Sequence, residues 1–218
     1  MLAHKSRYGN IAPDTQPMPL PGRCRTSWRS HRYNPHLYPR LPYPFLAIMF
    51  TAATASINPD YALLARQAAS ILEDERDLTA NAAQFSAFIY DTIADLNWAG
   101  FYLVKPAKKS VPGGLTQELL VGPFQGKVAC ARIAFGRGVC GTSAAERRTI
   151  VVADVHAFPG HIACDSASNA EIVLPVIKNG ELFGVFDIDS PSLNRFNEED
   201  RQGLEALVAI FVAATDFK

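Results

Sequence analysis

Apolar residues recur every three or four positions in three segments of the chain, which predicts three amphipathic helices. The first helix follows Asn58, which can serve as its N-cap, and Pro59 suits its first helical position. The second covers residues 79–95, and the third follows Asn197, for which Asp200 can complete a capping box. The apolar stripes consist of Tyr61, Leu64, Ala65, Ala68, Ile71 and Leu72, then Ala82, Phe85, Phe88, Ile89 and Ile93, and finally Leu204, Leu207, Val208 and Phe211.

Between the second and third helices the pattern changes to short runs rich in β-branched and aromatic residues, which are typical of strands. The clearest signal is residues 172–189, where two apolar runs flank Asn179-Gly180, the strongest two-residue signal for a type I′ hairpin turn. A polar loop with Pro and Gly covers residues 105–117, and a short helix that starts at glycine covers residues 138–148. The other expected strands cover residues 98–104, 118–124, 131–135 and 149–152.

Strands joined by hairpins, with helices at both ends, indicate an α+β domain with a central antiparallel sheet and flanking N- and C-terminal helices. A chain of 218 residues, 48% of them hydrophobic, can bury one core, so we expect a single domain over residues 56–218. The sequence contains no βαβ repeat, GxGxxG motif or P-loop, which argues against a doubly wound nucleotide-binding fold.

Residues 1–48 differ from the rest of the chain and are expected to form a disordered leader. They hold eight of the 15 prolines and seven basic residues against one acid, without helical or strand periodicity. We favour translation starting at Met49, because every coherent pattern begins after it. An organellar transit segment and a signal peptide using residues 44–55 are the alternatives, although the latter lies too far from the N-terminus. That apolar stretch is shorter than the roughly 20 residues of a membrane span, so we expect no membrane insertion.

The overall charge and the cysteines narrow the class of protein. The formal net charge is zero, which gives no sign of a nucleic-acid partner. Four cysteines are too few for a disulfide scaffold, and three of them, Cys130, Cys140 and Cys164, lie in the expected domain. An odd number of cysteines suits reactive thiols in a reducing compartment, so we expect a cytoplasmic protein.

Cys164 is the main candidate nucleophile. It lies in residues 160–165, a predicted exposed loop, where neighbouring His161 or backbone N–H groups would favour the thiolate. A buried, unreactive cysteine is the alternative reading. Cys140 stands at the start of a predicted helix, whose positive end also favours a thiolate, and Cys130 ends a loop. Both positions allow the Cα separation of about 4.4–6.8 Å that a disulfide requires.

A zinc site is a weaker reading of the same region. His156, His161 and Cys164 are possible ligands, but the chain has no CxxC or HxxxH motif and their spacing is irregular. We therefore expect no metal.

Three acids and one tryptophan complete the candidate site. Asp187 and Asp189 alternate with apolar residues, so both face one side of the strand, where they either bind a cation such as an ammonium group or mark the exit into water. With a regular register from the turn, Glu171 would oppose Ile188 and face away from Asp187. For the three acids to share a pocket, the strand must begin after Glu171 or carry a bulge. Trp98 is either a core residue or a pocket wall.

Several segments, in the same order, resemble the free methionine-(R)-sulfoxide reductase family of GAF-domain proteins. They are residues 97–103 (NWAGFYL), 122–130 (GPFQGKVAC), 136–142 (GRGVCGT), 160–175 (GHIACDSASNAEIVLP) and 184–190 (GVFDIDS). The resemblance runs from about residue 58 to the C-terminus, except that the loop at 105–117 is longer than usual and the leader has no counterpart.

The resemblance implies a GAF-like fold, a homodimer, and an oxidoreductase that counters oxidative stress by reducing free methionine-R-sulfoxide. Cys164 matches the catalytic cysteine, Cys130 the resolving cysteine and Cys140 the third thiol. Four further residues match positions for substrate binding or protonation: Trp98, Glu171, Asp187 and Asp189.

In the implied reaction a carboxylic acid, Glu171 or Asp189, protonates the sulfoxide oxygen and the Cys164 thiolate attacks the sulfur. A sulfenic acid remains and condenses to a disulfide with Cys130, or with Cys140 as a relay. Thioredoxin, which receives its electrons from NADPH, reduces the disulfide back to thiols. No metal or organic cofactor is required. A non-catalytic GAF domain that senses a small molecule or redox state is the alternative.

Overall fold

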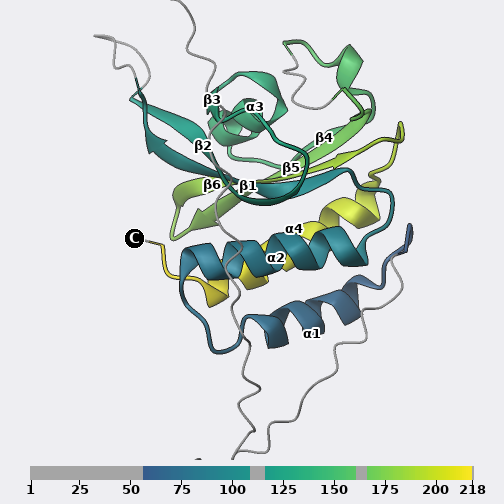
Figure 1. Cartoon of the computed structure of the whole chain (residues 1–218), viewed down its shortest axis with the longest axis vertical. Coiled ribbons are helices and arrows are strands. Elements are labelled where there is room, and N and C mark those ends of the chain that lie inside the picture. Colours follow the sequence, from purple (N-terminus) through teal and green to yellow (C-terminus); the bar gives the residue numbers. More distant parts are fainter. Residues whose placement is uncertain (1–55, 109–115, 161–165, 218) are drawn as a thin grey trace, which may run out of the picture. The chain divides into compact units, whose positions relative to one another are not determined.

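The computed structural model describes residues 56–108, 116–160 and 166–217. The predicted leader and Cys164 lie outside the described residues, as does His161. The described chain forms a six-stranded, wholly antiparallel sheet with helices on both faces (Figure 1), in the strand order β3-β2-β1-β6-β5-β4. The strands are β1 (Trp98–Pro106), β2 (Gln117–Gly126), β3 (Arg132–Ala134), β4 (Ile150–Val152), β5 (Ala170–Lys178) and β6 (Glu181–Ser190). The predicted α+β class with a central antiparallel sheet is confirmed.

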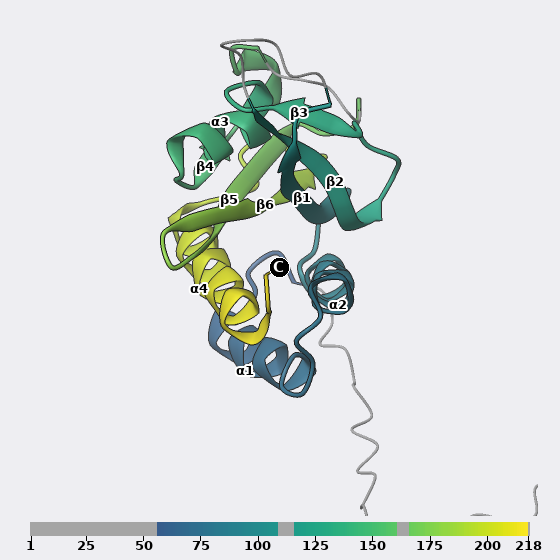
Figure 2. The ribbon, with the colours of Figure 1, turned by 90° about the vertical axis from the view of Figure 1, so that its left-hand side faces the viewer.

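Three long helices cover one face of the sheet: α1 (Tyr61–Ile71), α2 (Leu78–Thr92) and α4 (Glu198–Ala214). As Figures 1 and 2 show, α2 and α4 pack directly on the sheet, and α1 lies beyond them against α4. The core on this side is built around Phe85, Phe101, Phe186 and Phe211, which join α2, β1, β6 and α4 through ring-centroid distances of 4.5 to 6.0 Å. Among the described residues, none of the helices combines the length and the apolar character needed to cross a bilayer.

The opposite face of the sheet carries α3 (Gly138–Glu146) and the short η1 turn (Val155–Ala157), and it encloses a second core. Side chains at alternate positions of each strand point to opposite faces, so Trp98 and Tyr102 of β1 belong to this second core, whereas Phe101 belongs to the first. The prediction that this helix starts at glycine is confirmed, because α3 begins at Gly138. The φ of this residue is +60°, a backbone conformation that favours glycine. The candidate site lies on this second face.

The helix starts were predicted with mixed success. The capping box at α4 is confirmed: the Asn197 side chain accepts hydrogen bonds from the backbone N–H groups of Glu199 and Asp200. The prediction of Asn58 as the first N-cap is wrong. Asp60 caps α1 instead by accepting from the N–H of Leu63, so the helix begins two residues later than expected. Aspartate and asparagine cap helices equally well, which leaves the choice to the tertiary path of the chain.

The β5–β6 hairpin contains the feature on which the site depends. Asn179 and Gly180 have φ values of +53° and +78°, as a type I′ turn requires. The pairing starts regularly, with Ile177 opposite Leu182, but Val176 then opposes Gly184, so Phe183 is an extra residue on β6. This bulge shifts the register by one residue over the rest of the hairpin, which confirms the bulge alternative. The other alternative, a strand starting after Glu171, is wrong because β5 already includes that residue.

Candidate functional site

Three predicted site residues stand directly beside one another on neighbouring strands. Trp98 of β1 pairs with Asp189 of β6, and Asp189 pairs with Glu171 of β5. Residues opposite each other in an antiparallel sheet share a face, so these three side chains form one row across the sheet. Without the bulge at Phe183, Glu171 would point to the opposite face of the sheet, which α2 and α4 cover.

Asp187 lies in the next row of the same face, opposite Gly100 on β1 and Val173 on β5. Glu171 and Asp187 are both buried, with 6% of each residue exposed, whereas Asp189 is half-buried. The Oδ1 atom of Asp187 is buried and has no hydrogen-bond partner within the described part of the chain. A buried carboxylate oxygen that accepts no hydrogen bond costs free energy, so a hydrogen-bond donor of a ligand, or a cation, would bind favourably beside this atom.

Cys140 reaches the acids from the first turn of α3, on the other side of the site. Its Sγ lies 3.9 Å from Oε1 of Glu171, and one ligand atom each of Cys140, Glu171 and Asp187 lies within 4.8 Å of the others. The thiol is buried and free. Burial and the negative charges of Asp187 and Glu171 raise the pKa of Cys140 well above its ordinary value. The prediction that the helix end favours its thiolate is therefore wrong, because desolvation and two acids outweigh the dipole.

The buried acids favour the protonated state for the same physical reasons. Burial, followed by the charges of Asp187 and Asp189, raises the pKa of Glu171 well above its ordinary value. Burial also raises the pKa of Asp187 to about 6. Glu171 therefore keeps its proton to a higher pH than an ordinary carboxylic acid does, which is the direction of shift that a general acid requires.

An aromatic wall stands beside the acids. The indole of Trp98 stacks between Tyr102 and Phe124, at centroid distances of 5.7 and 5.2 Å, and its Nε1 donates to the carbonyl of Lys127 at 3.1 Å. Gly100 leaves room for this ring, because a β-carbon there would lie 2.7 Å from Trp98 Cη2. The prediction of Trp98 as a core residue is confirmed, and its ring lies in the same row of the sheet as Asp189 and Glu171.

Tyr102 is a site residue that the sequence analysis missed. It is almost fully buried, and its pKa is raised by burial and then by the charges of Asp187, Cys140, Asp189 and Glu171. Its hydroxyl therefore lies within electrostatic range of the whole cluster. The available signal was the strand period, since Tyr102 stands four residues after Trp98 and so shares its face.

Of the other two candidate cysteines, Cys130 lies within the described residues and Cys164 lies outside them. Cys130 is half-buried and disulfide-bonded, and its partner cysteine lies outside the described residues. Cys130 stands three residues after Lys127, whose carbonyl accepts the hydrogen bond from Trp98. After the segment that contains Cys164, the chain is anchored at the same end of the sheet: the Asn97 amide donates to Ser168 at 2.9 Å.

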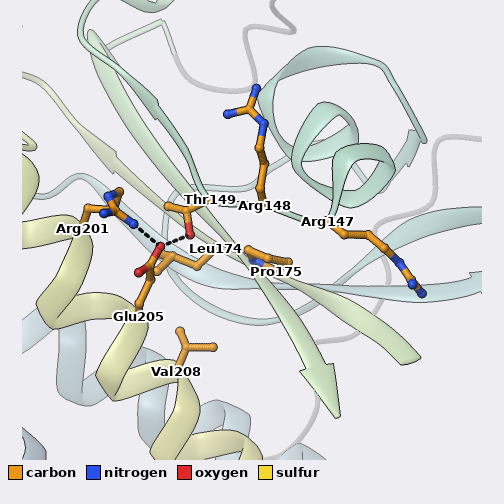
Figure 3. A pocket seen from close by; sticks show the side chains of 8 residues that line it. All are labelled: Arg147, Arg148, Thr149, Leu174, Pro175, Arg201, Glu205 and Val208. Atoms are coloured by element: carbon orange, nitrogen blue, oxygen red, sulfur yellow. Dashed lines mark hydrogen bonds and ion pairs between the residues drawn. The ribbon is translucent and has the colours of Figure 1, made fainter. Parts of the chain in front are cut away.

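A separate pocket of about 530 Å³ lies between α4 and the start of β4, and Figure 3 shows the side chains that line it. Its one carboxylate, Glu205, already accepts hydrogen bonds from Thr149 and Arg201, at 2.7 and 2.8 Å. Arg147 and Arg148 point in different directions rather than converging on a common point. The described residues that line this pocket include no cysteine, and the Glu205 contacts join α4 to the segment before β4.

Comparisons with known proteins agree with the observed fold. Residues 79–216 match the GAF domain family. Free methionine-R-sulfoxide reductase of Escherichia coli (strain K12) is 47% identical over 161 residues, which cover 72% of this chain and 92% of that protein.

Two solved structures extend the comparison. The structure of fRMsr of Staphylococcus aureus in complex with substrate is 46% identical, with a TM-score of 0.64, and the match covers 73% of this chain and 99% of that one. A Burkholderia vietnamiensis chain, described as a candidate GAF sensor protein, is 56% identical, with a TM-score of 0.64 and coverage of 71% and 92%. The chain therefore belongs to the free methionine-R-sulfoxide reductase family of GAF-domain proteins.

Proposed function

We propose that this protein is an oxidoreductase that reduces free L-methionine-(R)-S-oxide to L-methionine. The observation that carries the proposal is the bulge at Phe183, which brings Glu171 onto the same face as Asp187 and Asp189, beside Trp98. The arrangement offers an acid that holds a proton, acceptors for an ammonium group and an aromatic wall for a methyl group. Relatives named for this reduction support the choice of substrate.

Substrate binding follows from the charges of the site. The ammonium group of the free amino acid pairs with Asp187 and Asp189, and it satisfies the Asp187 Oδ1 atom, which has no hydrogen-bond partner among the described residues. A methionine within a peptide has no such ammonium group, which gives a physical reason for preferring the free amino acid. The methylsulfinyl group then packs against Trp98, and its oxygen accepts a proton from Glu171.

We assign the nucleophile to Cys164. Five residue steps separate it from Asn169, which span at most about 18 Å, and Asn169 donates its N–H to Ser190 at the end of β6. The Cys164 thiolate attacks the sulfoxide sulfur while Glu171 protonates the oxygen. Transfer of that oxygen to the cysteine releases methionine and leaves Cys164 as a sulfenic acid, so the sulfoxide is reduced by two electrons and the thiol is oxidised by two.

We assign resolution to Cys130 rather than Cys140. The Cys130 thiol attacks the sulfenic acid, which forms the disulfide and releases water. Two observations support this choice: Cys130 is half-buried and disulfide-bonded, whereas Cys140 is free, buried and held beside Glu171 by its weak S–H···O contact. Cys140 then acts by keeping Glu171 in place, not by relaying oxidation.

Regeneration requires a dithiol such as thioredoxin, reduced in turn by NADPH, so the protein itself needs no metal or organic cofactor. We place the reaction in the cytoplasm, where thiols are kept reduced. We also propose a homodimer, which sedimentation or light scattering of the purified chain will test.

The test is turnover of free methionine sulfoxide with thioredoxin, its reductase and NADPH. We expect the R epimer to be reduced, and the S epimer and a peptide-bound sulfoxide to be poor substrates. Cys164→Ser should lower turnover by about 10³-fold or more, the scale of losing a catalytic nucleophile. Cys130→Ser should release one methionine per protein and then stop. The fourth cysteine, Cys24, belongs to residues 1–48, and Cys24→Ser is the matched thiol control that should remain active. A protein that binds sulfoxide but never consumes it is a sensor, which would overturn the proposal.

A further inference from the structure

We propose that Cys140, Glu171 and Asp187 form a binding site for one zinc-type divalent cation, which excludes the amino acid from the pocket. The three residues come from α3, β5 and β6, so their positions are set by a helix and two paired strands. Their ligand atoms lie within 4.8 Å of one another, with Cys140 Sγ and Glu171 Oε1 3.9 Å apart. Ligands of a tetrahedral zinc ion, bound at about 2.0–2.3 Å, lie about 3.3–3.5 Å apart, so small side-chain adjustments suffice.

An independent observation points to a ligand at this place. Among the described residues, the buried Asp187 Oδ1 has no hydrogen-bond partner, and no basic side chain forms an ion pair with Asp187. A cation beside Cys140 and Glu171 would reach the carboxylate group that carries this oxygen. The donor set has three protein ligands and leaves a fourth position for water, as in zinc sites that remain open.

The chemistry of the donors selects the type of ion. A thiolate is a soft ligand that favours zinc or cobalt over magnesium or calcium, which prefer oxygen alone. Once deprotonated, the three buried ligands would repel one another, and a divalent cation offsets most of that repulsion. Binding releases the thiol proton, and any proton held by the two carboxyl groups, to solvent.

The consequence for activity rests on the proposed function. Asp187 is also the proposed partner of the substrate ammonium, and Glu171 the proposed proton donor. An ion held by both residues occupies the same space as the amino acid. Zinc is therefore expected to compete with methionine and its sulfoxide, so the site is inhibitory and plays no part in the reduction.

The experiment uses Co²⁺ as a spectroscopic probe of the metal-free, full-length Cys24→Ser protein with its disulfide closed. In this form the disulfide can join only Cys130 and Cys164, and Cys140 is the one remaining thiol. We expect one equivalent of Co²⁺ to bind with a thiolate-to-cobalt absorption band. Cys140→Ala should abolish the band, and Asp187→Asn should weaken binding of Co²⁺ and Zn²⁺ by at least about 10-fold. Excess L-methionine, which fills the pocket without reacting, should raise the apparent Kd for Co²⁺.

Asp189→Asn is the matched control, because Asp189 is an acid on the same strand face but outside the three-ligand set. It should keep the band and bind within about threefold of the parent. The proposal is overturned by an absent band, by a band that survives Cys140→Ala, or by equal losses in Asp187→Asn and Asp189→Asn. Competition is overturned if methionine leaves the Kd unchanged. Because cobalt binding needs no turnover, these outcomes are independent of whether the protein reduces the sulfoxide in metal-free buffer.

Discussion

Replacing Asp187 by asparagine is expected to stabilise the folded protein above about pH 6 and to leave its stability nearly unchanged near pH 4. Burial raises the pKa of this carboxyl group from 3.8 to about 6. The folded state therefore binds the proton more tightly than the unfolded state does. Below pH 4 both states are protonated, and the group carries no penalty. Between about pH 4 and pH 6 the unfolded state loses this proton while the folded state keeps it, so the stability falls over that interval. Above about pH 6 the folded state also ionises, in a buried site, and the loss of stability is complete.

The size of the effect follows from the pKa difference. A shift of about two units corresponds to about 3 kcal/mol of stability lost by the native protein at neutral pH, because one unit is worth about 1.36 kcal/mol. Asparagine has a similar shape and no charge, so Asp187→Asn avoids that loss. For a domain of this size the gain corresponds to a melting temperature about 6–12 °C higher. The same substitution should impair turnover, because it removes a proposed partner of the substrate ammonium.

The assay is urea or thermal unfolding of the reduced protein and the variant at pH 4 and pH 7.5, and the quantity of interest is the difference between them at each pH. Asp74→Asn, in an exposed turn, is the matched control and should change the free energy of unfolding by less than about 0.5 kcal/mol at either pH. The reasoning is refuted if Asp187→Asn is no more stable than the parent at pH 7.5. It is also refuted if the difference is the same at both pH values, because a packing effect would not titrate.

Two further substitutions test the packing around the site and the buried charges. Gly100→Ala places a β-carbon 2.7 Å from Trp98 and 2.3 Å from a neighbouring phenylalanine. The substitution should therefore destabilise the fold by about 1–3 kcal/mol and change the near-ultraviolet circular dichroism. An unchanged melting curve and spectrum would contradict the close packing. Asp200→Ala removes the ionic partner of Arg195, whose side chain is 4% exposed and lies 3.3 Å from the carboxylate, and leaves the guanidinium with its hydrogen bonds to the carbonyl of Ala94. We expect a loss of about 3–5 kcal/mol by urea unfolding, whereas a loss below about 1 kcal/mol would show that the pair behaves like an exposed one.

Features that depend on a few neighbouring residues could be predicted from the sequence. The Asn179-Gly180 turn formed because glycine and asparagine tolerate positive φ, and the capping box at Asn197 formed because its partner stands three residues away. Asp187 and Asp189 share a face because strand side chains alternate. The first helix shows the limit of such reasoning, since Asn58 and Asp60 are both good caps and the local sequence does not choose between them.

The composition of the site was decided by the tertiary structure. Whether Glu171 faces Asp187 depends on one extra residue, Phe183, on the opposite strand, and no local pattern shows where a bulge will form. The sequence placed Cys140 correctly at a helix start, where the dipole alone would favour the thiolate. Only the packing of α3 over the sheet buries that thiol beside Glu171 and raises its pKa, because desolvation and repulsion depend on residues far away in the chain. The sequence thus determined the types of chemical group available, and the tertiary structure determined which of them meet and in which protonation state.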